Sequence, residues 1–110
     1  MASDAQSTMS DALDRLWARF LPQIEQRVHT LAAAAQAFAA GALSEETRQT
    51  AHAEAHKLAG VLGTFGLTRG TELASELETL YAQPIDPDPE LAARLTTAAA
   101  ELRTIVAARK

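Results

Sequence analysis

Apolar residues recur along the first third of the chain at intervals of three or four positions. This spacing places them on one face of an α-helix, because such a helix turns by about 100° per residue. The stripe consists of Leu13, Trp17, Phe20, Ile24, Val28, Leu31, Ala35 and Phe38. Pro22 interrupts the stripe and has no N–H to donate. We therefore expect a short helix from Ser10, a break or kink, and then a longer helix from Pro22 to Ala40.

Another helix is predicted after Gly41, which ends the helix that begins at Pro22. Ser44 followed by Glu45 and Glu46 is typical of an N-cap with acidic residues in the first turn. The apolar stripe of this helix consists of Ala51, Ala55, Leu58, Leu62 and Phe65. Gly66 then permits a turn.

Two more helices follow the same periodicity. One covers about Thr68 to Ala82, with Gly70 on its apolar side permitting close helix packing. The stripe of this helix is Gly70, Leu73, Leu77, Leu80 and Tyr81. After the loop "QPIDPDPE", Asp88 as N-cap and Pro89 at the first helical position open the last helix. Its stripe is Leu91, Leu95, Ala98, Leu102 and Ile105.

Amphipathic helices with short connections predict an all-α, antiparallel four-helix bundle with a short extra N-terminal helical segment. We expect residues 1–9 to form a disordered leader and residues 10–110 to form the bundle domain. The composition agrees, because hydrophobic residues make up 47% of the 110 residues and aromatic ones only 5%, which favours helices over strands.

Charge and cysteine content narrow the function further. The formal net charge is −4, and no basic patch indicates nucleic acid as a partner. There is no cysteine, the N-terminus does not resemble a signal peptide, and the alanine-rich run 31–43 is too short to span a bilayer. We expect a soluble, cytoplasmic monomer that does not bind membranes.

His56 lies on the wrong side of its helix to belong to the core. It points about 140° away from the centre of the apolar stripe, so we expect its ring to be exposed. Gly60 and Gly63 lie within about 40° of it, although glycine in an exposed helix interior costs roughly 1 kcal/mol relative to alanine. A partner surface that needs this space would explain such a bare patch. The predicted docking residues are His52, Ala53, Lys57, Ala59, Gly60 and Gly63.

An exposed imidazole suits phosphoryl transfer. Its neutral ring nitrogen is a nucleophile at physiological pH, and such transfer depends mainly on positioning and charge stabilisation. The sequence has no Walker motif and no kinase-type glycine loop that would hold ATP. The chain is therefore expected to carry phosphate without drawing it from a nucleotide.

Residues 55–78, "AHKLAGVLGTFGLTRGTELASELE", resemble the motif of histidine-containing phosphotransfer (HPt) domains. The matching positions are Ala55, His56, Leu58, Gly60, Gly63 and Gly66, with the later pair Leu77 and Glu78. The resemblance implies a four-helix bundle whose His56 accepts phosphate from a receiver-domain aspartate or a sensor histidine kinase and passes it on. It also implies no cofactor, because magnesium in such relays belongs to the receiver.

Two positions depart from that motif. Ala59 stands where many members carry lysine, and Val61 stands where serine is common. Lys57 points about 100° away from His56 and is at best a partial substitute for the missing cation. These departures favour an alternative function, a helical docking module that binds a receiver or another signalling partner without carrying phosphate.

Two metal-dependent alternatives have less support. His52 and His56 are one helical turn apart, but no third ligand is evident on that face, so we expect no metal site. A metal-dependent bundle enzyme would need inward carboxylates and histidines, whereas the predicted stripes are apolar.

Overall fold

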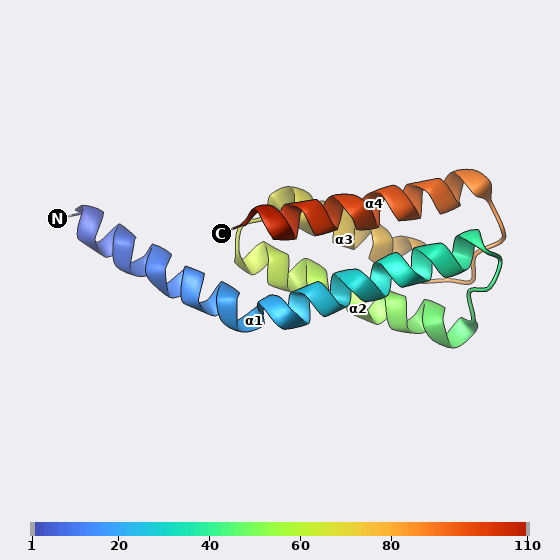
Figure 1. Cartoon of the computed structure of the whole chain (residues 1–110), viewed down its shortest axis with the longest axis horizontal. Helices are drawn as coiled ribbons and strands as arrows, with labels where there is room; N and C mark the ends of the chain where they lie inside the picture. The colour runs from blue at the N-terminus through green and yellow to red at the C-terminus, as the bar shows by residue number, and fades with distance from the viewer. Residues whose placement is uncertain (1, 110) are drawn as a thin grey trace.

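The computed structural model describes residues 2–109, with side chains from Thr8 onward, and four α-helices account for most of this range (Figure 1). They are α1 (Ala2–Ala39), α2 (Glu45–Thr64), α3 (Thr68–Leu80) and α4 (Pro89–Ala108). Helices α1 and α3 each pack against both α2 and α4. The predicted all-α four-helix bundle is confirmed. None of the described helices has the length and apolar character needed to cross a bilayer.

The predicted helix ends agree closely with the structure. The Ser44 hydroxyl accepts a hydrogen bond of 3.0 Å from the main-chain N–H of Thr47 at the start of α2. The carboxylate of Asp88 accepts from two N–H groups in the first turn of α4. Gly41 and Gly66 have φ values of 69° and 71°, in the left-handed region that glycine adopts without strain. The capping residues therefore predicted the starts of α2 and α4, and the two glycines predicted the turns that follow α1 and α2.

Of the break or kink expected at Pro22, the break is wrong, because α1 continues through this residue. Proline removes the hydrogen bond to the carbonyl of Ala18, but both residues are exposed, so water can solvate that carbonyl. Figure 1 shows α1 changing direction in its blue N-terminal half. The apolar stripe remains in register across the proline, with Trp17 and Ile24 both buried.

The expected leader is helical from Ala2 onward, so Ser10 is not a helix start. Met1 of this leader and Lys110 of the expected domain lie outside the described residues. Figure 1 shows the first turns of α1 extending beyond the bundle. Phe20, predicted to be a core residue, is 39% exposed although Trp17 before it and Ile24 after it are buried. Leu13 is only half-buried.

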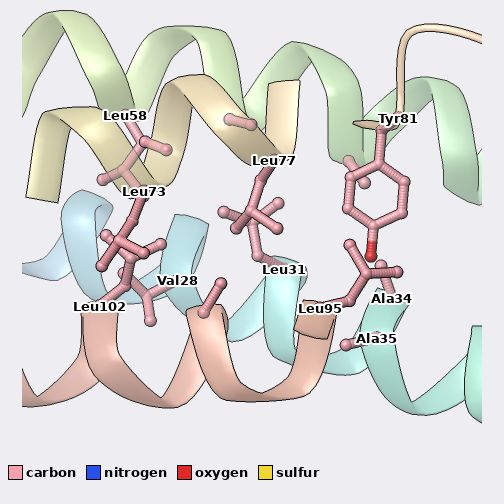
Figure 2. Close-up of a cluster of buried hydrophobic side chains, with 14 of the residues drawn as sticks. Val28, Leu31, Ala34, Ala35, Leu58, Leu73, Leu77, Tyr81, Leu95 and Leu102 are labelled. Atoms are coloured by element: carbon pink, nitrogen blue, oxygen red, sulfur yellow. The ribbon is translucent and has the colours of Figure 1, made fainter. Parts of the chain in front are cut away.

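The core lies between all four helices and is filled mainly by leucine and alanine (Figure 2). Gly70 is buried, and a Cβ atom there would lie 2.9 Å from Leu62 Cδ1, which confirms its predicted packing role. Tyr81 is fully buried, and its hydroxyl has no hydrogen-bond partner among the residues that the structure describes. Burial raises the pKa of Tyr81 to about 12.

Candidate functional site

His56 lies on the outer face of α2, as its position opposite the apolar stripe predicts. Its side chain is 72% exposed, whereas Ala55 and Leu58 beside it are completely buried. The backbone is helical on both sides of His56, because α2 begins eleven residues before it and ends eight residues after it, at Thr64. The ring is therefore held on a fixed element and remains open to a large partner.

The Nδ1 atom of His56 lies 2.8 Å from Oε2 of Glu78 on α3. A carboxylate can only accept, so Nδ1 carries the proton and donates it to Glu78. In the neutral ring, the lone pair is then on Nε2, the atom on the opposite side of the ring. This hydrogen bond favours one tautomer and one ring orientation, and it leaves Nε2 on the opposite side of the exposed ring from Glu78.

Glu78 entered the sequence prediction only as part of a motif pair, without a role. Its contact with His56 joins residues 22 positions apart on two helices. The distance depends on the rotation and register of α3 against α2, which the periodicity of a single helix does not determine. The only indication of this contact in the sequence was that Glu78 lies next to Leu77, a residue of the predicted apolar stripe of α3.

The bare patch around His56 is present, although its members differ in exposure. Gly60 and Gly63 are exposed, and a Cβ at Gly60 would find nothing within 4 Å. A Cβ at Gly63 would make only an ordinary contact of 3.6 Å with Oγ1 of Thr71. Ala53 is also exposed. Ala59 is half-buried and packs against the core, so its expected place on the outermost face needs correction.

His52, also predicted as a docking residue, is half-buried, and its Nδ1 atom lies 2.8 Å from the main-chain oxygen of Glu78. Both histidines of α2 therefore contact the same residue of α3, one through its main chain and one through its side chain. Within residues 2–109, no group of three or more histidine, aspartate or glutamate side chains is placed to hold a metal ion.

Lys57 is exposed, and its ammonium group lies 4.0 Å from a carboxylate oxygen of Glu54. Glu54 also forms an ion pair with Arg27 of α1. These contacts orient Lys57 toward α1, whereas His56 is turned toward Glu78 on α3. Lys57 is thus less suited to contact a phosphoryl group on His56 than its position in the sequence suggests.

A four-helix bundle with an exposed, hydrogen-bonded imidazole on its side is the arrangement expected of the class of proteins that take part in phosphotransfer. The family model of the Hpt domain matches residues 15–105 of the chain. The chain therefore belongs to the Hpt domain family, whose members act in two-component phosphotransfer and have no ATP site of their own.

Comparison with curated proteins gives one similarity to Protein RcaC of Microchaete diplosiphon, with 34% identity over 76 residues. The aligned region covers 69% of this chain but only 12% of that protein. No solved structure matches the chain.

Proposed function

We propose that His56 is the phosphoacceptor of this Hpt domain and that it carries a phosphoryl group between partner proteins. The observation that supports this proposal most strongly is the hydrogen bond of 2.8 Å between Nδ1 of His56 and the Glu78 carboxylate. It provides an exposed ring with one nitrogen anchored and the other available. The partners are a receiver domain of a response regulator, a sensor histidine kinase, or both.

In the proposed step, the lone pair of Nε2 attacks the phosphorus atom of an aspartyl phosphate on the receiver. An N–P bond forms while the P–O bond to the aspartate breaks, and the electron pair of that bond leaves with the carboxylate. The ring keeps its Nδ1 proton and becomes positively charged, and the Glu78 carboxylate 2.8 Å away stabilises this charge. The same step in reverse passes the phosphoryl group from His56 to the aspartate of a second receiver.

The docking residues have a steric role in this proposal. An in-line attack requires the aspartyl phosphate of a folded receiver to reach Nε2. Gly60 and Gly63 have no side chains and therefore leave room for that approach along α2. Ala53, with its small side chain, extends this surface toward the N-terminus of α2. Lys57 and His52 border the same face of α2.

The test is to incubate the chain with phosphorylated receiver domains and to locate acid-labile phosphate by mass spectrometry. Wild type is expected to be labelled at His56, and His56→Gln is expected to lose labelling. That substitution should change stability by less than about 0.5 kcal/mol, because the side chain is exposed. His29→Gln, which alters an exposed histidine on α1, is the matched control.

Labelling of His56→Gln at another histidine would refute the assignment. A wild-type chain that binds receivers but never takes up phosphate would favour the docking-module alternative. That alternative draws on Ala59, which is half-buried and provides no cation at the position where lysine is common in the family.

A further inference from the structure

The C-terminal end of α3 is fastened to α2 by two basic side chains. Arg48 donates a hydrogen bond to the main-chain oxygen of Tyr81, and His52 contacts the main-chain oxygen of Glu78 at 2.8 Å. Arg48 and His52 are four residues apart, so they lie on the same face of α2 in successive turns. Together they form a clamp on the last turn of α3.

The carbonyl of Glu78 is one of the groups that a helix end leaves without a helical partner. The N–H four residues later belongs to Ala82, and it bonds to the carbonyl of Thr79 at 3.3 Å instead. His52 therefore caps this carbonyl from a neighbouring helix. Because a carbonyl can only accept, His52 must carry its proton on Nδ1.

Glu78 is held at both of its ends by histidines of α2. Its main-chain oxygen receives the hydrogen bond of His52, and its carboxylate receives that of His56, each at 2.8 Å. The Glu78 side chain is 29% exposed. Because the side chain is attached to α3, the position of its carboxylate depends on where the α3 backbone lies. A displacement of the last turn of α3 would move the carboxylate away from Nδ1 of His56.

We infer that His52 is a positioning residue for phosphoryl transfer: by capping the Glu78 carbonyl it keeps the Glu78 carboxylate in place to orient His56. This inference rests on the proposed function of His56 as phosphoacceptor. It assigns His52 a role within the protein. The sequence had instead suggested that His52 contacts the partner.

The test compares His52→Ala, which removes the donor, with His52→Asn, whose amide nitrogen occupies nearly the same place as Nδ1 of histidine. His29→Ala is the control for loss of a histidine elsewhere. Two quantities are measured on each sample after circular dichroism has shown that it is folded. The first is the rate of phosphoryl transfer from a phosphorylated receiver domain, and the second is the proton position on the His56 ring, from two-bond ¹H–¹⁵N correlation spectra.

His52→Ala is expected to slow transfer by about tenfold, the lower end of the loss seen when a partner of an orienting group is removed. The population of His56 with its proton on Nδ1 is expected to fall in parallel. His52→Asn should restore the proton position and return the rate to within about threefold of wild type, since it offers the same donor. His29→Ala should match wild type in both quantities.

Two results would overturn the inference. In one, His52→Ala equals His29→Ala in rate and in the His56 proton position. In the other, both His52 variants slow transfer while the His56 proton stays on Nδ1, which would mean that His52 contacts the partner directly. Failure of the proposed function looks different, because wild type would then take up no phosphate from any donor, while the spectra would still show whether His52 controls the His56 ring.

Discussion

Replacing Gly60 by glutamine separates helix stability from access to His56. Gly60 lies one turn after His56 on the exposed face of α2 and does not have a positive φ. Apart from its chain neighbours and the nearby backbone of α2, a Cβ at this position would meet no atom of the described residues within 4 Å, so the substitution introduces no clash. The change in folding free energy therefore reduces to helix propensity. Glutamine should stabilise the chain by roughly 0.5 to 1 kcal/mol relative to glycine.

That gain corresponds to a rise in melting temperature of about 2 to 5 °C for a domain of this size. The effect on transfer should have the opposite sign. Side chains four residues apart on a helix have Cβ atoms about 5 to 6 Å from one another, so the glutamine would project beside the imidazole. A receiver displaced by only 1 Å can lose on the order of a hundredfold in rate.

Melting temperature and transfer rate are measured on the same sample of Gly60→Gln, with Gly60→Ala as the matched variant. Alanine gives an equal or larger gain in propensity with only one methyl group. We expect both variants to be more stable than wild type, and transfer to fall much further for glutamine than for alanine. Full transfer activity in a stabilised Gly60→Gln protein would refute the idea that Gly60 leaves room for a partner.

Three other substitutions probe separate parts of the structure. Glu78→Gln keeps an acceptor for Nδ1 of His56 but removes the negative charge. Phosphoryl transfer should slow by about tenfold in single-turnover assays, which corresponds to ~1.4 kcal/mol in activation free energy. An unchanged rate would show that the charge of the carboxylate has no role in transfer. Tyr81→Phe deletes an unpaired buried hydroxyl and should not lower stability in urea unfolding at pH 8. Since the pKa of Tyr81 is raised to about 12 and that of an unfolded tyrosine is about 10, wild type should lose up to about 1.4 kcal/mol per pH unit between these values, and the variant should lack this loss. Ser44→Ala removes the cap on Thr47 and should cost about 1 kcal/mol in the same assay; no loss would show that water replaces the cap.

The parts of the fold that local chemistry determines could be predicted from the sequence. Ser44 and Asp88 accept hydrogen bonds from the first turns of their helices, as capping residues do. The exposure of His56 follows from counting residues along one helix. Each of these predictions depends on atoms within about one or two turns of the residue concerned.

Features that depend on how helices pack were not predictable in this way. Pro22 ended the expected first helix, yet α1 continues because the residues it would disrupt face solvent. Arg48 is 8% exposed and was missed as a buried residue, because its partners are Glu45 and the carbonyl at the end of α3. The contacts of Glu78 with both histidines need the register of α3 against α2, which two separate stripes leave undetermined.

A phosphoryl carrier has two requirements that oppose each other. The imidazole must be exposed so that folded partners can reach it, but an exposed side chain is free to rotate and to change tautomer. In this chain α2 exposes the ring, while Glu78 on the neighbouring helix holds one of its nitrogens. The Glu78 side chain is 29% exposed, and the main-chain oxygen of the same residue lies 2.8 Å from Nδ1 of His52. The orientation of the His56 ring is therefore set by contacts between α2 and α3. The exposed face of α2 beside the ring, with Gly60 and Gly63, is not needed for that orientation and can stay free of side chains.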